Sequence, residues 1–296
     1  MNSRNPVAIA CLLLGATTWG VVWYPFRLLE QAGMSSALST LAAYVVAVAV
    51  GCVIAPRALR ELPGHVRDMG PIALFAGLAN VGFLIAATGT EVVRVVLLFY
   101  MAPVWTVPLA WLMLGERLTV RGFWVIAIAM FGALVMLWRP ELGAPLPKNG
   151  YEWIALAAGF FFAVTNVLVR RAQAASAEAK GLASCIGVLL IAIPAALLFQ
   201  PQVSAWPVLA LSNIVLIAIV GTVLLATTIA MQHGLTVVPA NRAAVILLAE
   251  LIVAAIAAYL LAGERLRLTD AIGGALIVAG GLVSAVGERK VSEVNA

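Results

Sequence analysis

Long stretches without a charged residue constrain this chain more than any other feature of its sequence. Eight such stretches run between successive charged residues, and each is at least 17 residues long. A helix of about 20 apolar residues spans the hydrocarbon core of a bilayer. Only 10% of the residues are charged and 64% are hydrophobic, whereas soluble domains have about 25% and 45–50%. We therefore expect an integral membrane protein with nearly all of its residues in the bilayer.

The uncharged stretches also predict how many helices there are. They cover 5–26, 31–56, 69–90, 95–115, 122–138, 153–169, 181–241 and 271–287. The stretch 181–241 is long enough for two helices, and a polar, proline-flanked turn at 200–207 divides it. A further apolar segment, roughly 238–262, contains a single acid, Glu250. Together these segments predict ten transmembrane helices and leave no room for a soluble domain.

The lysine and arginine residues predict the orientation. With the N-terminus inside, twelve of them lie in inner segments and six in outer segments. Positive residues concentrate on the cytoplasmic side of membrane proteins, so both termini are expected in the cytoplasm. The same bias accounts for the net charge of +5, with anionic lipid headgroups rather than nucleic acid as the counter-charge. The three cysteines fall within apolar segments and are interpreted as small buried side chains, with no metal or cofactor expected.

The two halves of the chain repeat each other. A shift of 148 residues lays 93–135 on 241–283, so that Gly115-Glu116-Arg117-Leu118 falls on Gly263-Glu264-Arg265-Leu266 and Arg94 on Arg242. We expect one five-helix repeat over 1–145 and a second over 146–296, together forming one transmembrane domain. Because five is odd, the second repeat enters the membrane from the opposite side. The predicted fold is an all-α membrane protein of ten helices in two inverted-topology repeats, which is typical of secondary transporters.

Several short motifs carry a family resemblance. They are Trp19-Gly20, Ala102-Pro103-Val104 followed by Gly115-Glu116-Arg117, and Glu250 followed by Gly263-Glu264-Arg265. In this order and spacing the chain resembles the EamA-type transporters of the drug/metabolite transporter superfamily, and among them the bacterial aromatic amino acid exporters. It departs from them at Leu251, where members often have proline. The resemblance implies export of aromatic and other neutral amino acids across the bacterial inner membrane. It also implies a central cavity surrounded by helices 1, 3, 4, 6, 8 and 9, with helices 5 and 10 at the periphery.

Polar and aromatic residues in the middle of those six helices are the candidate substrate-binding residues. They are Trp19, Trp23, Asn80, Phe83, Tyr100, Met101, Phe162, Thr165, Asn166, Thr227, Thr228 and Glu250. Such a set suits a ligand with an apolar body and polar ends. Each residue has a structural alternative: the amides can bond a neighbouring helix, the hydroxyls their own backbone, and the rings can pack. For Glu250, a structural contact, a substrate amine and proton transfer all remain open.

The prolines indicate where helices end or bend, and the absence of known motifs limits the possible functions. Pro25 is expected to end the first helix, and Pro103, inside the fourth, is the expected hinge of alternating access. The chain has no Gly-x-x-x-x-Gly-Lys-Ser/Thr motif, so transport would run downhill or use an ion gradient. No set of catalytic side chains stands at one depth, and an enzyme is not expected. One chain holds enough polar and aromatic groups for a monomeric pathway. The alternative is a drug or metabolite exporter for organic cations or nucleosides.

Overall fold

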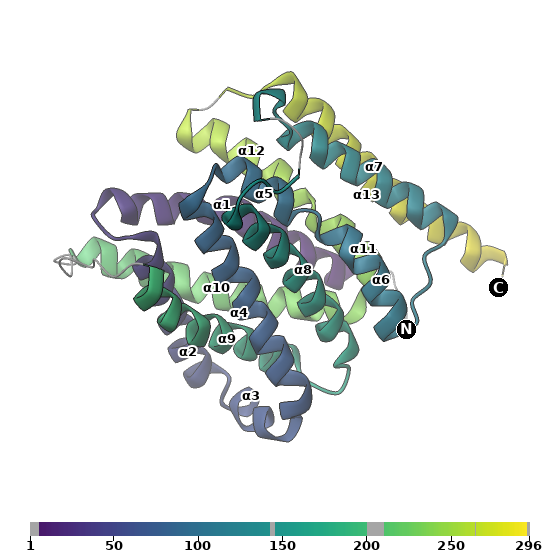
Figure 1. Cartoon of the computed structure of the whole chain (residues 1–296). Coiled ribbons are helices and arrows are strands. Elements are labelled where there is room, and N and C mark those ends of the chain that lie inside the picture. Colours follow the sequence, from purple (N-terminus) through teal and green to yellow (C-terminus); the bar gives the residue numbers. More distant parts are fainter. Residues whose placement is uncertain (1–5, 143–145, 200–209, 264, 295–296) are drawn as a thin grey trace.

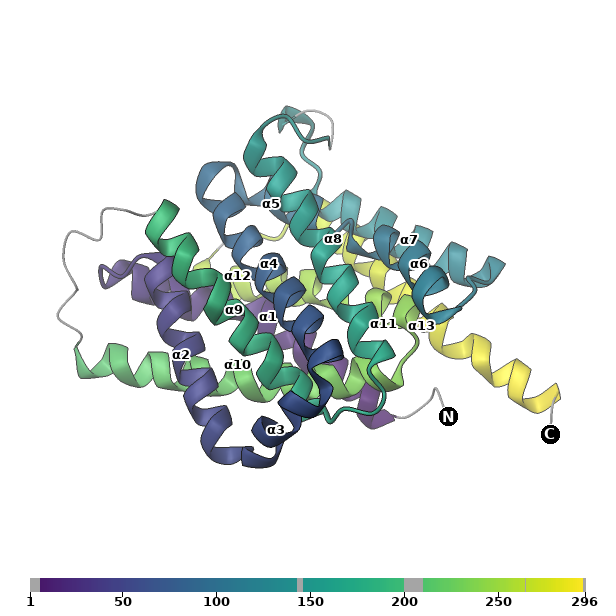
Figure 2. The ribbon, with the colours of Figure 1, turned by 60° about the horizontal axis from the view of Figure 1, so that its bottom comes forward.

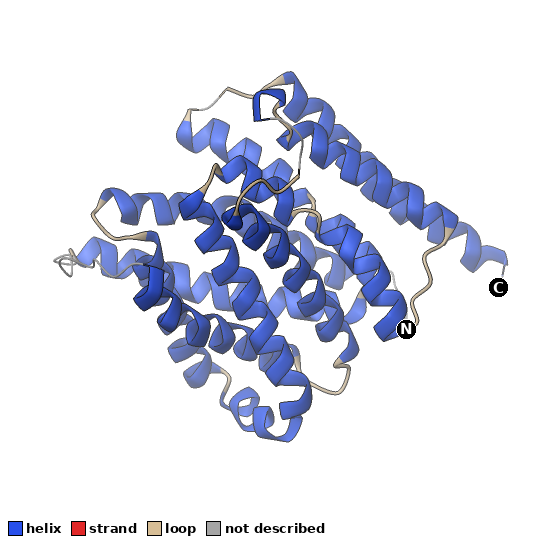
Figure 3. Cartoon of the chain, viewed as in Figure 1, coloured by secondary structure: helices blue, strands red, loops and turns tan. Residues whose placement is uncertain are grey.

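Helices make up the whole regular structure of the described part of the chain (Figure 3). A computed structural model describes residues 6–142, 146–199, 210–263 and 265–294. The α-helices are α1 Pro6–Gln31, α2 Ser36–Ile54, α3 Pro56–Glu61, α4 Val66–Gly89, α5 Val92–Phe99, α6 Ala102–Leu114, α7 Val120–Leu137, α8 Gly150–Arg171, α9 Ala177–Phe199, α10 Leu211–Val237, α11 Ala240–Leu247, α12 Ala249–Ala262 and α13 Leu268–Val294. Two short 3₁₀ helices, Leu62–His65 and Pro140–Leu142, lie in loops.

The all-helical membrane fold is confirmed. Nine helical segments within the described residues are long and apolar enough to cross a bilayer, and α13 adds a shorter apolar stretch, Leu268–Val283. In this count α5 and α6 form one span and α11 and α12 form another. Large apolar side chains lie on the outer surface, among them Trp111 and Leu112 of α6 and Leu260 of α12. In water this exposure would be costly, whereas lipid tails cover it without penalty. The expected turn at 200–207 lies outside the described residues, as does Glu264.

The helix contacts follow the predicted repeat. In the first repeat α1 packs on α10 of the second, and the equivalent α8 packs on α4 of the first. Likewise, α4 packs on α9 and the equivalent α10 packs on α2. The fifth helices of the repeats, α7 and α13, lie along each other at one edge of the bundle (Figures 1 and 2). Each repeat therefore completes its packing only against the other.

Glycines bring two of these central helices into direct backbone contact. A Cβ atom added to Gly187 of α9 would lie 1.8 Å from the backbone oxygen of Ala73 in α4. One added to Gly77 of α4 would lie 2.4 Å from the backbone oxygen of Gly187. Only hydrogen fits at these positions, which is the close packing that small residues allow between membrane helices.

The fourth span of each repeat is broken at the same place. The first is interrupted at Tyr100 and Met101, between α5 and α6, and the second at Leu248, between α11 and α12. Tyr100 and Leu248 are separated by the 148 residues of the sequence repeat. Both spans then end on a left-handed glycine, Gly115 and Gly263, each with φ of 68°. The backbone path, like the sequence, is therefore repeated.

Proline explains the first break but not the second. Pro103 lies in the first turn of α6, where its missing N–H group costs no helical hydrogen bond. The second break has no proline: α12 begins at Ala249, and Leu251 N–H donates to the Leu248 carbonyl at 3.1 Å. The expectation for Pro25 is wrong, since α1 continues through it to Gln31. A membrane helix tolerates one lost hydrogen bond when its neighbours hold it in place.

Candidate functional site

A small cavity lies where the two broken spans meet α8. Its lining residues are Phe99, Tyr100, Ala102, Pro103, Thr106, Phe162, Asn166, Ala244, Leu247, Leu248 and Glu250. They come from α5 and α6 of the first repeat and from α8, α11 and α12 of the second. The cavity volume is about 20 Å³, which is room for about one water molecule. The repeats therefore line a small site between them.

Glu250 faces Tyr100 across the cavity. The break before α12 puts Glu250 in the first turn of that helix, and the break after α5 puts Tyr100 at the facing helix end. The Tyr100 hydroxyl interacts with the Glu250 carboxylate. This contact joins the two repeats at their two points of interruption. It also gives the one acid expected within the spans a neutral partner rather than a cation.

Asn166 of α8 contributes a second polar group. Its side chain is only 5% exposed, and its Oδ1 atom is buried without a hydrogen-bond partner among the described residues. A buried acceptor left unpaired costs about 1–3 kcal/mol, so such atoms are uncommon. Thr106 is already satisfied, because its hydroxyl donates to the Ala102 carbonyl at 2.9 Å. Asn166 is therefore the cavity residue with an unused acceptor.

The aromatic rings of Phe99, Tyr100 and Phe162 form one wall of the cavity. Phe83 packs against Phe99 but does not line the cavity. Phe99 is the centre of these rings, with ring centroids 5.2 Å from Phe83, 5.3 Å from Phe162 and 5.7 Å from Tyr100. These distances and tilted planes are those of favourable aromatic pairs. Three predicted residues are thus brought together by Phe99, which the sequence did not single out.

The remaining predicted residues do not line this cavity. Asn80 accepts from the Tyr44 hydroxyl at 3.3 Å and donates to the Ala76 carbonyl at 2.9 Å. Thr165 donates to its own helix at the Phe161 carbonyl. Met101 lies in the first break and is half-buried.

Four further predicted residues have contacts of their own. The hydroxyls of Thr227 and Thr18 lie 3.1 Å apart, and Thr228 interacts with the Cys185 side chain. Trp23 donates to the Gly20 carbonyl at 3.0 Å, and Trp19 packs between two apolar clusters. In this conformation these polar side chains contact neighbouring helices or their own backbone.

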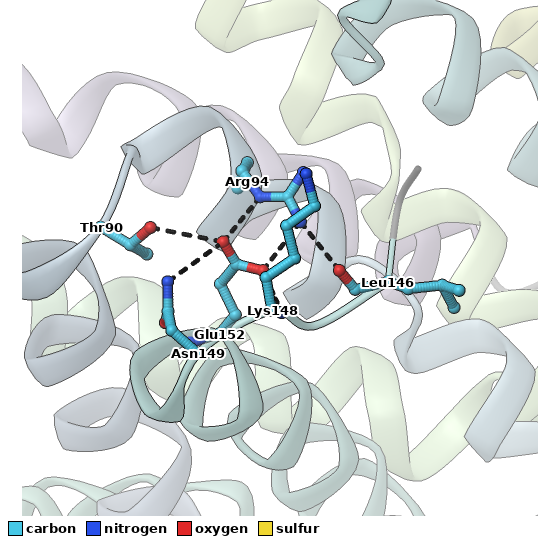
Figure 4. Close-up of polar contacts among 6 residues, drawn as sticks. All are labelled: Thr90, Arg94, Leu146, Lys148, Asn149 and Glu152. Atoms are coloured by element: carbon cyan, nitrogen blue, oxygen red, sulfur yellow. Dashed lines mark hydrogen bonds and ion pairs between the residues drawn. The ribbon is translucent and has the colours of Figure 1, made fainter. Parts of the chain in front are cut away.

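A buried ion pair lies at the first turn of α8, at one end of the bundle. Arg94 of α5 donates to Glu152 of α8 from Nε at 2.7 Å and from Nη2 at 2.8 Å (Figure 4). The same carboxylate accepts the Lys148 backbone N–H at 2.8 Å, and Arg94 donates to the Leu146 carbonyl at 2.8 Å. Both side chains are less than 10% exposed. The pair joins the first repeat to the second.

A second ion pair lies at the last turn of α8, at the opposite end. Glu116, which follows α6, accepts from Arg170 Nε at 3.1 Å and from the Ala240 backbone N–H at 2.9 Å. Arg170 also donates to the Thr236 and Val237 carbonyls. These side chains are 17% and 22% exposed, so this contact is more solvated than the first. Glu116 belongs to the repeated Gly-Glu-Arg motif, and its contacts again cross from one repeat to the other.

The arrangement defines a class of protein. Two inverted repeats enclose a site at the interruption of paired helices, and ion pairs join the repeats at both ends; this is the architecture of secondary transporters. Among the described residues no group of three His, Cys, Asp or Glu side chains is placed to hold a metal ion.

Comparison with known proteins identifies the family. The model of the EamA-like transporter family matches twice, at residues 6–138 and 150–286. The chain therefore belongs to this family, within the drug/metabolite transporter superfamily, and is a multi-pass membrane transporter of small molecules. An uncharacterized transporter of Archaeoglobus fulgidus is 29% identical over 232 residues, which cover 78% of this chain and 81% of the relative. A solved crystal structure shares the fold with a TM-score of 0.75 and 18% identity, covering 96% of this chain and 98% of its own.

Proposed function

We propose that the protein exports aromatic and other neutral amino acids across the bacterial inner membrane by alternating access. The observation that carries the proposal is the small cavity between the two helix interruptions, which aromatic rings, Glu250 and Asn166 line together. Rings hold the apolar body of such a substrate, and the polar side chains hold its charged end. Without an ATP-binding motif, export runs downhill or is coupled to an ion gradient.

The cavity enlarges when either end opens. At about 20 Å³ it is much smaller than the several hundred cubic ångströms of an ordinary ligand site. Substrate entry therefore separates the repeats, and the candidates outside the cavity become part of the pathway at that stage. They are Trp19, Trp23, Asn80, Phe83, Met101, Thr165, Thr227 and Thr228. Pro103 is the hinge at which α6 changes its angle to α5.

The direction follows from the charge bias of the sequence. With both termini in the cytoplasm, Arg94 and Glu152 lie at the periplasmic end and Glu116 and Arg170 at the cytoplasmic end. Export then begins with the loss of the Glu116 contacts, and release requires the loss of the Arg94 contacts. All the parts of this pathway lie in one chain, so a monomer is sufficient.

Reconstituted transport tests the proposal. Liposomes that contain only this protein are offered labelled tryptophan, phenylalanine, threonine, a nucleoside and a lipophilic cation, with and without a pH gradient. Saturable flux of the amino acids is expected, and the gradient comparison shows whether protons are coupled. Flux of the nucleoside or cation alone would overturn the amino acid assignment while leaving the transporter family in place.

Organic cations are the second candidate. One observation favours them: Glu250 is the one ionisable carboxylate among the residues that line the cavity. A carboxylate in a low-dielectric site attracts positive charge, and aromatic faces add to that attraction.

A further inference from the structure

We infer that the central site recognises its substrate through a protonated amine held between the Glu250 carboxylate and the Asn166 amide oxygen. The inference rests on the proposed function, because it takes the small cavity as the substrate site. It goes further by naming the one chemical group that a substrate must carry.

The cavity presents the hydrogen-bond acceptors of two side chains, Asn166 and Glu250. Asn166 Oδ1 is buried and lacks a partner among the described residues. The Glu250 carboxylate, which lines the same cavity, offers about four acceptor sites. Acceptors are satisfied by donors, and an ammonium group has three N–H donors and no acceptor. One such group can serve both acceptors, whereas an ionised carboxylate or phosphate offers a donor to neither of them.

The charges of the residues that line the cavity also favour a protonated amine. None of the eleven residues that line it is a lysine, arginine or histidine. A negative ligand group would meet Glu250 without any cation to balance the two charges. A cationic amine instead neutralises Glu250 where an isolated charge is costly. The faces of Phe99, Tyr100 and Phe162 offer a further cation–π contribution.

The carboxylate of an amino acid is therefore dispensable for binding, and the amine is not. Aromatic amines that lack the carboxylate should occupy the site at least as well as the parent amino acid. Aromatic acids that lack the amine should not. Charge-assisted hydrogen bonds to two acceptors make this difference about 10- to 100-fold in affinity.

Competition binding separates these ligands. The purified protein in lipid nanodiscs is loaded with labelled tryptamine and challenged with tryptophan, tryptophanamide, unlabelled tryptamine and indole-3-propionate. The two ligands without a carboxylate are expected to compete at least as well as tryptophan, and indole-3-propionate 10- to 100-fold more weakly. If tryptamine fails to bind, or if indole-3-propionate competes as well as tryptophan, the inference is wrong. If tryptamine binds but tryptophan neither binds nor is transported, the amine site stands and the amino acid assignment fails.

Substitutions at Glu250 and Asn166 test whether these two residues cause the preference for an amine. Glu250→Gln and Asn166→Leu should each reduce the preference for tryptamine over indole-3-propionate by at least about 10-fold. Asn166→Asp keeps the size of the side chain and adds negative charge, so it should increase that preference. This variant provides the test if Asn166→Leu fails to fold. Glu178→Gln is the matched control, because Glu178 is an exposed acid at the start of α9. An unchanged preference in both Glu250→Gln and Asn166→Asp would refute the assignment.

Discussion

The Arg94–Glu152 pair is expected to hold one end of the transporter closed. Its atoms lie 2.7 and 2.8 Å apart, and both side chains are almost fully buried. Removing one partner of a buried pair costs about 3–5 kcal/mol, because the other charge is left uncompensated. Glu152→Gln keeps the shape and one acceptor oxygen, so we take the lower value of about 3 kcal/mol. If the pair forms in one conformation only, that cost shifts the ratio of the two conformations about 100-fold.

Accessibility of the cavity measures this shift. Thr106, which lines the cavity and is 1% exposed, is replaced by cysteine in a protein whose three native cysteines have been changed to alanine. A membrane-impermeant thiol reagent is then added to right-side-out and to inside-out vesicles. Glu152→Gln should speed labelling in one vesicle type and slow it in the other, since opening at one end closes the other.

Two controls distinguish gating from a general loss of stability. Glu178→Gln should leave labelling unchanged in both vesicle types. The double variant Arg94→Gln, Glu152→Gln leaves no unpaired charge, so it should recover part of the thermal stability lost in either single variant. Equal changes from both sides, or a lower unfolding temperature with unchanged labelling, would refute the gating argument.

Three further predictions concern the other end, the helix contacts and the hinge. Glu116→Gln should change the labelling in the opposite sense to Glu152→Gln. The free-energy difference between the two conformations should change by about 1–2 kcal/mol, because the Glu116 ion pair is partly solvated. A change in the same sense would contradict this prediction. Gly187→Ala should lower the unfolding temperature through a clash worth at least about 1–3 kcal/mol, whereas Gly281→Ala, where an added Cβ meets nothing within 4 Å, should not. Pro103→Ala should slow transport without weakening substrate binding; wild-type transport with unchanged cysteine accessibility would disprove the hinge.

The helices could be predicted from the sequence because the bilayer imposes their length. A span needs about 20 apolar residues, so the distances between charged residues gave the fold. The ends of helices were less predictable. Pro25 lies inside α1, and Leu248 interrupts the ninth span without a proline, since tertiary contacts rather than local sequence decide where a membrane helix bends. The repeat could have located that second break, because Leu248 lies 148 residues after Tyr100.

The candidate site was predicted in part. The position of a residue along its membrane-spanning helix can be counted from the sequence. Residues near the middle of a helix were chosen in this way, and three of them, Tyr100, Asn166 and Glu250, line the cavity. Which way a side chain faces depends on the neighbouring helices, so Asn80, which hydrogen-bonds Tyr44 of α2, could not be distinguished from Asn166. The Arg94–Glu152 contact joins residues 58 positions apart, and no local pattern pairs them.

The charges at the two ends also explain how two similar repeats can favour one conformation. If the repeats were identical, the inward-facing and outward-facing states would have equal energy, because exchanging the repeats converts one state into the other. The arginine is repeated in the sequence, as Arg94 and Arg242, but Glu152 is not. When the first helices of the two repeats are aligned on Gly15 and Gly159, the residue equivalent to Glu152 is the buried Ala8. The Arg94–Glu152 pair at one end of the bundle is therefore not copied in the sequence of the other repeat. We therefore expect the more solvated Glu116–Arg170 contact to be the weaker closure and the proposed conformational equilibrium to favour opening at that end.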